Sequence, residues 1–271
     1  MEPPKITIIT CTLNSAAHLT ETIESVKKQS YQNFEHLFID GGSSDQTIEI
    51  IKSFYLKPRL IIKQKNGAYD AFNKGIESAT GQVIGFLHSD DVLFDNQALE
   101  RIASAFSNQE IDYYCSRMLI YDKDLKSSFA ILGASPHHQS FKDQLYSSTY
   151  FAHPTYYCKK EIIQKVGKFN TKYQIAADID WLYRLEKISD SFFFDPKPLV
   201  KFRGEGGLSA NRYFTGLKEE FKIRIKNEGA GFVLITIYGY HLMRRLIRFT
   251  LETIKLNKAI GFFRKIIIKL A

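Results

Sequence analysis

The feature that most constrains this fold is a change of hydrophobic period that repeats through the first hundred residues. Short runs rich in β-branched and aromatic residues alternate with segments in which apolar residues recur every three or four positions, as in strands and helices respectively. The expected strands cover residues 5–10, 34–40, 59–63 and 82–87. The expected helices cover residues 17–29, a segment ending near 54, 69–79 and 96–106. These units predict a single, mostly parallel, right-handed wound α/β sheet with helices on both faces.

The second half of the chain gives a weaker pattern. Helical spacing returns only at residues 159–166 and 179–188, and no internal repeat indicates a solenoid. The composition changes near residue 212. We therefore expect one domain at residues 1–211 and a helical region at residues 212–271.

The positive charge of the chain is concentrated in that second region. Residues 212–271 hold 13 Lys and Arg against 4 Asp and Glu, whereas the remaining residues hold 24 against 25. The uncharged run at residues 229–243 is shorter than the about 20 apolar residues of a bilayer span. We expect basic amphipathic helices that lie on an anionic membrane surface; the alternative is a helical pair packed on the domain. No nucleic-acid recognition motif accompanies the charge, so no nucleic-acid partner is expected.

The cysteines and the first residues predict a cytoplasmic protein. Cys11, Cys115 and Cys158 are too few and too far apart for a disulfide framework. Residues 1–10 carry one lysine before a short apolar run and lack the other features of a signal peptide. Together with the basic region, this predicts a peripheral location on the inner face of the cell membrane.

Polar residues follow three of the predicted strands. Ligands of open α/β sheets bind beyond the carboxyl ends of the strands. There the sequence places residues 10–14, Asp40 and the run His88-Ser89-Asp90-Asp91. Clustered carboxylates repel an anionic ligand unless a divalent cation bridges them to its phosphates. The alternative is that Asp40 caps a turn and that the run at 88–91 is a plain acidic loop.

Other phosphate-binding classes do not fit. There is no GxxxxGK sequence, and the glycines near Gly229 lack the third glycine and the preceding strand of a dinucleotide fingerprint. These observations exclude a P-loop NTPase and a Rossmann dehydrogenase. A metal-dependent hydrolase or phosphoesterase and a catalytically inactive membrane-surface adaptor stay open as alternatives.

Four segments, in order, resemble motifs of family 2 glycosyltransferases, which have the GT-A fold. They are PKITIITCTLN, FEHLFIDGGSSDQT, KNGAYDAFNKGIESATGQVIGFLHSDD and AADIDWLYRL. The resemblance covers roughly residues 4–210 and, within the family, extends to bacterial cell-surface polysaccharide enzymes of the colanic-acid type. It implies a metal-dependent transferase of the hexosyltransferase type, EC 2.4.

The resemblance also implies which residues bind the sugar-nucleotide donor. These residues are Thr10, Asn14, Asp40, Asp70, Asn73, Lys74 and Asp90. Thr10 and Asn14 would edge the nucleotide pocket, and Asp40 would accept hydrogen bonds from the base or ribose. An alternative for Asp70 and Lys74 is an i,i+4 surface pair.

Asp90 is implied as the main metal-contacting carboxylate, with His88 in the position of the first Asp of the family's DxD motif. Histidine binds Mn²⁺ but suits Mg²⁺ poorly, so the expected cofactor is Mn²⁺ or Mg²⁺ with its identity open. Asp91 either assists the metal or caps the following turn.

Asp178 matches the Asp of the family's Glu-Asp pair and is implied as the catalytic base, although Ala177 replaces the Glu. Asp180 is the second candidate. Residues i and i+2 face apart on a helix, so we expect only one of them to enter the site. An alternative role for Asp178 is to cap the helix that follows it, and Arg184 is expected to pair with Asp180.

On the acceptor side, the resemblance points to His153 and to the loop positions Gly206, Gly207 and Ser209. A structural histidine and a tight turn are the respective alternatives. Trp181, the sole tryptophan, is expected in the core.

These features together predict an inverting glycosyltransferase. A sugar would pass from a nucleoside diphosphate sugar, with UDP favoured, to a hydroxyl of a lipid-linked glycan acceptor in polysaccharide or glycoconjugate biosynthesis. The cation would offset the charge on the leaving diphosphate while Asp178 takes the hydroxyl proton.

Overall fold

The computed structural model describes residues 2–63, 67–108, 110–133, 153–204 and 212–229, with residues 231, 239 and 243. The chain divides into two compact units, Met1–Asn211 and Arg212–Ala271. In the second unit the structure describes α9 (Tyr213–Glu228). Among the described residues, no helix combines the length and the apolar character needed to cross a bilayer.

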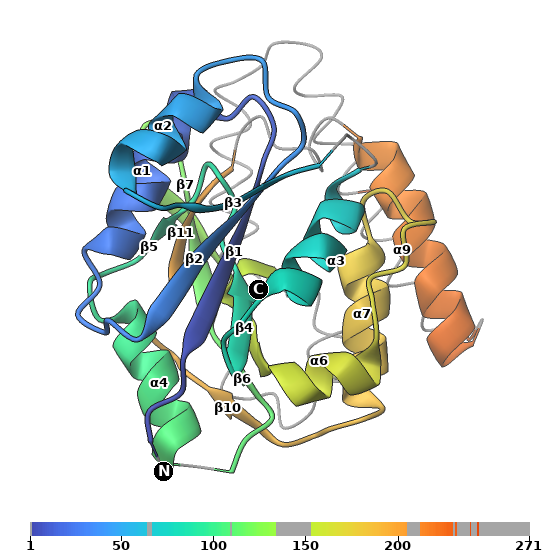
Figure 1. Cartoon of the computed structure of the whole chain (residues 1–271). Coiled ribbons are helices and arrows are strands. Elements are labelled where there is room, and N and C mark those ends of the chain that lie inside the picture. The colour runs from blue at the N-terminus through green and yellow to red at the C-terminus, as the bar shows by residue number, and fades with distance from the viewer. Residues whose placement is uncertain are drawn as a thin grey trace. The chain divides into compact units, whose positions relative to one another are not determined.

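The first unit is built on a seven-stranded sheet (Figure 1). Its strands are β1 (Ile6–Thr12), β2 (Phe34–Asp40), β3 (Arg59–Ile62), β4 (Val83–Phe86), β6 (Tyr113–Cys115), β9 (Tyr157–Lys159) and β10 (Phe192–Phe194). They lie in the order β10-β6-β9-β4-β1-β2-β3. The four strands β4, β1, β2 and β3 are parallel, whereas β9 runs antiparallel to both of its neighbours. The main sheet is therefore mixed and mostly parallel.

A second sheet lies beside the first, and the prediction of a single sheet was wrong in this respect. Its strands are β5 (Val92–Leu93), β7 (Arg117–Tyr121), β8 (Ser128–Gly133) and β11 (Val200–Arg203), in the order β5-β11-β7-β8. β11 pairs parallel with β7 and antiparallel with β5. β7 and β8 pair with each other as neighbours in sequence, whereas β11 pairs with β5 and β7 from far away in sequence, so no local period reveals the sheet as a whole.

Helices cover both faces of the main sheet. They are α1 (Ala16–Lys27), α2 (Thr47–Phe54), α3 (Ala68–Ser78), α4 (Ala98–Asn108), α6 (Lys160–Val166) and α7 (Ala177–Glu186). Figure 1 shows α1, α2 and α4 on one side and α3, α6 and α7 on the other. In β1, Ile8 belongs to the core beneath α4, while Ile9 contacts Gly75 of α3. Six of the seven residues of β1 are buried, as expected for a strand that is covered by helices on both faces.

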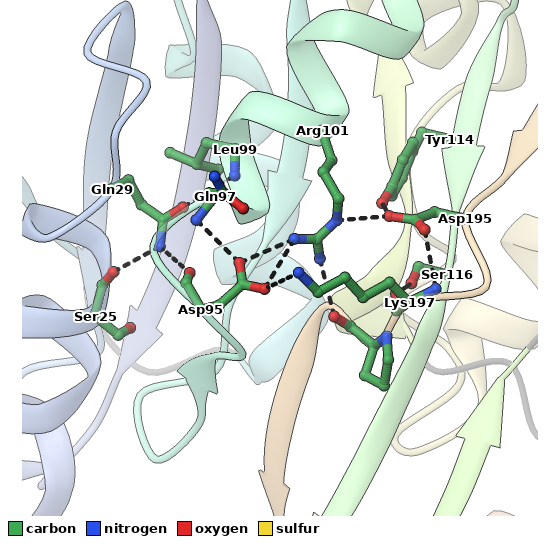
Figure 2. Close-up of polar contacts among 11 residues, drawn as sticks. Ser25, Gln29, Asp95, Gln97, Leu99, Arg101, Tyr114, Ser116, Asp195 and Lys197 are labelled. Atoms are coloured by element: carbon green, nitrogen blue, oxygen red, sulfur yellow. Dashed lines mark hydrogen bonds and ion pairs between the residues drawn. The ribbon is translucent and has the colours of Figure 1, made fainter.

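An ion-pair network connects α4 with both sheets (Figure 2). Arg101 of α4 donates through Nε to Asp195, which follows β10, at 2.7 Å, and through Nη1 to Asp95, which follows β5, at 2.9 Å. Tyr114 of β6 donates to the same Asp195 carboxylate at 2.5 Å. Lys197 pairs with Asp95 at 2.7 Å. Each carboxylate therefore accepts from more than one fixed donor.

Candidate active site

The loop after β4 gathers three potential metal ligands. Ligand atoms of His88, Asp90 and Asp91, called here the cation cluster, lie within 4.8 Å of one another. Burial by itself would lower the pKa of His88. The hydrogen bond with Asp91 and the charges of Asp91, Asp90 and Asp178 together outweigh this effect, so the pKa of His88 is raised above its ordinary value.

Asp91 supports His88 from behind. The Asp91 side chain is fully buried, its Oδ2 lies 3.1 Å from His88 Nδ1, and its Oδ1 accepts a 3.1 Å hydrogen bond from the backbone N–H of Arg203. Burial raises the pKa of Asp91, although the contact with His88 opposes this change. A carboxylate bound to one imidazole nitrogen fixes the ring and leaves the other nitrogen for a metal. The atoms best placed for a cation are therefore His88 Nε2 and the Asp90 carboxylate.

Asp178 lies in the first turn of α7. Its Oδ1 accepts hydrogen bonds from the Tyr69 hydroxyl and from the Ile179 backbone N–H, each at 3.0 Å. Burial raises the pKa of Asp178 to about 6, although these hydrogen bonds and the charge of His88 act in the opposite direction. Asp178 and Asp90 both act on the pKa of His88. The predicted base and the predicted metal carboxylate therefore both interact electrostatically with the His88 imidazole.

Asp180 takes a different position. It is 4% exposed and accepts from Arg184 Nε at 3.1 Å, the i,i+4 pair expected from the sequence. Arg184 also donates to the Val166 carbonyl at 2.6 Å. The two aspartates of α7 are therefore in different surroundings, Asp178 against Tyr69 and Asp180 against Arg184.

Helix α3 holds the segment that leads into α7. The Asn73 amide donates to the Phe169 carbonyl at 3.0 Å and accepts from the Phe169 N–H at 2.8 Å. The Tyr69 hydroxyl reaches the Ile175 carbonyl at 2.5 Å as well as Asp178. The Asn73 side chain is thus engaged within the protein. Tyr69 was missed by the sequence reasoning, although it precedes Asp70 inside the quoted motif.

Asp70 and Lys74 line a polar cavity of about 260 Å³ on the side of α3. The i,i+4 ion pair between Asp70 and Lys74, which was the alternative expected from the sequence, does not form. Asp70 pairs with Lys63, which follows β3, and Lys74 lies 3.9 Å from Glu77. Asn73 contributes to the same lining. Three of the predicted donor residues therefore surround one cavity.

Asp40 is at the end of β2 as predicted, but its carboxylate is engaged by the loop that follows. It is fully buried. Its Oδ1 accepts from the N–H groups of Gly42 at 2.9 Å and Ser43 at 2.8 Å, and its Oδ2 accepts from the hydroxyls of Thr12 at 2.7 Å and Ser43 at 2.6 Å. Asp40 builds the loop, and a bond to the base or ribose stays a prediction.

Asn14 joins the loops after β1 and β2. Its backbone is left-handed with φ of 51°, its N–H donates to Ser43 Oγ at 2.9 Å, and its Oδ1 accepts from the Ser44 N–H at 2.9 Å. One residue later, Ser15 accepts from Ser89 at 2.9 Å. This contact links the β1–α1 loop to the loop that carries the cation cluster.

Thr10 lies apart from this group. Its side chain is fully buried, and its hydroxyl is 3.0 Å from His36 Nε2 inside the sheet. The geometry gives no support to a direct nucleotide contact through this hydroxyl.

His153, which is predicted to lie on the acceptor side, opens the short helix η1 (His153–Thr155) next to the cation cluster. Its ring centroid lies 5.1 Å from Phe72, 4.6 Å from Phe86 and 5.9 Å from His88. Burial, together with the charge of His88, lowers the pKa of His153 to about 3, so the imidazole is neutral at ordinary pH.

Two further expectations concern the predicted acceptor-side loop and the tryptophan. Gly206, Gly207 and Ser209 lie outside the described residues, so their placement near an acceptor stays a prediction. Trp181 is 6% exposed and donates to the Gly167 carbonyl at 2.8 Å. This burial confirms the expected core position.

Comparison with known proteins identifies the family of the first unit. Residues 7–167, more than half of the chain, match the sequence model described as glycosyl transferase family 2. A PGL/p-HBAD biosynthesis glycosyltransferase of Mycobacterium bovis is 32% identical over 189 residues, covering 68% of this chain and 70% of that protein. An uncharacterized glycosyltransferase of Rickettsia prowazekii is 27% identical over 224 residues, covering 80% and 69%.

Two solved structures share the fold at lower identity. Staphylococcus aureus TarS 1–349 in complex with UDP-GlcNAc has a TM-score of 0.63 at 17% identity, covering 88% of this chain and 71% of that chain. The mannosyltransferase PcManGT from Pyrobaculum calidifontis, in complex with GDP-Man and Mn²⁺, has a TM-score of 0.63 at 17% identity, covering 88% and 69%. This likeness bears on the architecture alone.

Proposed function

This chain belongs to glycosyl transferase family 2, and we propose that it transfers a sugar from a nucleoside diphosphate sugar to an acceptor hydroxyl with inversion at the anomeric carbon. It is a nucleotide-sugar-dependent glycosyltransferase of glycoconjugate biosynthesis, and its α/β fold is of the GT-A type. The observation that carries the proposed mechanism is that ligand atoms of His88, Asp90 and Asp91 lie within 4.8 Å of one another.

His88 and Asp90 would hold a divalent cation. One imidazole nitrogen and one carboxylate suit Mn²⁺ better than Mg²⁺, and Asp91 already fixes the His88 ring for this role. A cation bound there supplies positive charge against the departing diphosphate. The two protein ligands leave further coordination positions for phosphate oxygens, as expected where metal and nucleotide bind together.

Asp178 would act as the general base. A carboxyl with a pKa of about 6 is ionised at neutral pH and still basic enough to take a proton in the transition state. Tyr69 and the Ile179 N–H orient it. Attack of the activated hydroxyl from the face opposite the diphosphate inverts the anomeric carbon. Asp180 is unsuited to this role because it is buried against Arg184.

The donor is proposed to be a UDP-sugar, with a GDP-sugar as the alternative. The related folds support both, since TarS is described with UDP-GlcNAc and PcManGT with GDP-Man. Asp70 and Lys74 would contact the sugar from the cavity beside α3. Asn14 would edge the nucleotide, while Asp40 and Asn73 would shape the pocket by holding its walls.

The acceptor is proposed to be a lipid-linked glycan at the inner face of the membrane. The support is the concentration of Lys and Arg in residues 212–271, together with the M. bovis relative's name, which places that relative in PGL/p-HBAD biosynthesis. His153 would line the acceptor side with Gly206, Gly207 and Ser209. Assembly of a colanic-acid-type polysaccharide stays a prediction within this proposal.

Turnover of nucleotide sugars by two variants of α7 tests the mechanism. Asp178→Asn keeps the size of the side chain but removes the base, so we expect sugar transfer to fall by about 10²–10⁴-fold with donor binding retained. Asp180→Asn is the matched comparison, and we expect its main effect to be a lower Tm through loss of the Arg184 ion pair. If Asp178→Asn transfers sugar at the wild-type rate, Asp178 is not the base. If sugar transfer is lost only in Asp180→Asn, the role of base belongs to Asp180.

A further inference from the structure

We propose that Arg203 is a positioning residue for the cation cluster, because it holds the backbone and the supporting carboxylate of the loop that presents His88 and Asp90. This inference rests on the proposed function, since it concerns the geometry of the same metal site. It adds a residue from the second sheet to a site whose other members come from loops and helices around the main sheet.

The Arg203 side chain is buried and contacts three separate segments. It is 3% exposed. Nε donates to the Asp90 backbone carbonyl at 2.7 Å, Nη1 donates to the Lys123 carbonyl at 2.5 Å, and Nη2 pairs with the Glu21 carboxylate of α1. The planar guanidinium is suited to several fixed acceptors at once, which a lysine ammonium cannot match.

The Arg203 backbone reaches the other half of the cluster. Its N–H donates to Asp91 Oδ1 at 3.1 Å, and Asp91 Oδ2 contacts His88 Nδ1 at 3.1 Å. Arg203 therefore acts on both proposed metal ligands: directly on the peptide of Asp90, and through Asp91 on the ring of His88.

The position of Arg203 is set by strand pairing. It is the last residue of β11, where it pairs in register with Tyr121 of β7. One residue earlier, the ring of Phe202 lies 6.2 Å from the His88 ring in an edge-to-face arrangement. The second sheet thus delivers two consecutive residues to the back of the cation cluster, although 112 residues separate Arg203 from Asp91.

A purely structural role would leave metal affinity unaffected by the loss of this side chain. Supporting residues around metal ligands, in contrast, typically change metal affinity or activity by about 10–100-fold when they are removed. Metal affinity in the absence of donor and acceptor therefore separates the two roles.

The test is a Mn²⁺ titration of the full chain, with free Mn²⁺ followed by electron paramagnetic resonance. We expect Arg203→Met to weaken Mn²⁺ binding by about 10–100-fold. Arg101→Met is the matched control, because Arg101 is also an arginine that bonds carboxylates and a carbonyl, but its partners Asp95, Asp195 and Pro198 lie outside the cation cluster. We expect this control to lower the Tm and to leave the Mn²⁺ affinity at the wild-type value.

A second variant covers the case in which Arg203→Met does not fold. Glu21 is 53% exposed on α1, so Glu21→Ala is expected to fold and to weaken Mn²⁺ binding in the same direction, by a smaller factor. If Arg203→Met folds and binds Mn²⁺ with the wild-type affinity, the inference is overturned. If Arg203→Met does not fold, a wild-type Mn²⁺ affinity in Glu21→Ala overturns it instead. Equal weakening in Arg101→Met also overturns it, because the effect would then follow general stability.

Sugar transfer by the wild type separates this inference from the proposed function. Suppose that the wild type transfers sugar and binds Mn²⁺, and that Arg203→Met binds Mn²⁺ with the same affinity. This result contradicts the positioning role of Arg203 and leaves the proposed function standing. A wild type that neither binds Mn²⁺ nor turns over any nucleotide sugar contradicts the proposed function. Transfer without Mn²⁺ binding removes the metal site, and the role of Arg203 with it.

Discussion

The Asp178 carboxyl receives two opposing influences whose balance sets the pH at which it can accept a proton. Burial raises its pKa from 3.8 to about 6, while the hydrogen bond from Tyr69 acts to lower it. A proposed base must be ionised to act, so kcat/KM is expected to fall about tenfold for each pH unit below pH 6 and to level off above it. The pH dependence thus follows the folded-state pKa of Asp178.

Tyr69→Phe removes one hydrogen bond that favours the charged carboxylate. We expect the acid limb of the kcat/KM profile to move to higher pH in this variant, because the folded-state pKa of Asp178 rises further. The control is Tyr157→Phe, since the Tyr157 hydroxyl is buried without a hydrogen-bond partner among the described residues. An acid limb that moves to lower pH, or that moves equally in both variants, would contradict this account.

Single residues of the site differ in how far the sequence could predict them. His88, Asp90 and Asp178 lie within quoted motifs, and the structure groups His88 with Asp90, while the charge of Asp178 acts on the pKa of His88. Tyr69 and Arg203 could not be found in this way, because their roles depend on contacts more than a hundred residues away in sequence.

Burial also decides what a motif residue can do. Asp40 ends β2 as the sequence predicts, whereas Thr10 lies two residues before the end of β1. The side chains of both are engaged, Thr10 by His36 and Asp40 by the β2–α2 loop. A motif fixes where a residue lies along the chain, but its free hydrogen-bonding capacity depends on neighbours that only the folded structure reveals.

At the scale of elements, α3 is placed by its close approach to β1. Gly75 permits this contact, because a Cβ there would lie 2.5 Å from Cγ2 of Ile9. The same helix carries Tyr69 and Asn73, which hold the segment leading to Asp178. The spacing between α3 and β1 therefore bears on the site as well as on the core.

Gly75→Ala is expected to destabilise the protein by about 1–3 kcal/mol through overpacking, even though alanine is the better helix former by up to about 1 kcal/mol. Urea denaturation measures the free energy of unfolding. Ile9→Ala removes the atoms that collide, so the double variant should be more stable than the sum of the two single changes. Strict additivity, or a stabilised Gly75→Ala, would show that α3 does not depend on this contact.

The elements themselves were predictable where the local pattern was strong. The alternation in the first hundred residues predicted β1 to β4 and α1 to α4 close to their observed bounds. The second sheet was missed because β5 has two residues and pairs with β11, more than a hundred residues later. The local sequence of β9 does not indicate its direction either, because its antiparallel orientation is defined by its pairing with β4 and β6.

At the scale of the whole molecule, charge separates the two units. Residues 1–211 are almost neutral, and residues 212–271 are strongly basic. Each basic residue near an anionic surface contributes about 1 kcal/mol to binding. Membrane attachment, if it occurs as proposed, should therefore depend on the second unit and weaken as salt increases.

Reversal of the charges at Arg244, Arg245 and Arg248 in the full chain tests this attachment. We expect binding to phosphatidylglycerol-containing vesicles to fall at least about tenfold, measured by sedimentation with the vesicles. The control reverses three exposed lysines of the first unit, Lys52, Lys57 and Lys126, so the net charge changes equally. Equal loss in both variants would indicate attraction to net charge alone, and unchanged binding in the first would refute the proposed anchoring.

The reciprocal bonds between the Asn73 amide and the peptide of Phe169 have a mechanical consequence. Because the planar Asn73 amide both donates to and accepts from the Phe169 backbone, the two bonds resist sliding of α3 along this segment as well as its separation from it. A carboxylate at this position could not donate, and a longer amide would change the spacing. The helix that lines the cavity and the segment that leads to Asp178 are thereby coupled. A saccharide bound there, as proposed, would keep its distance from the Asp178 carboxylate when either part fluctuates.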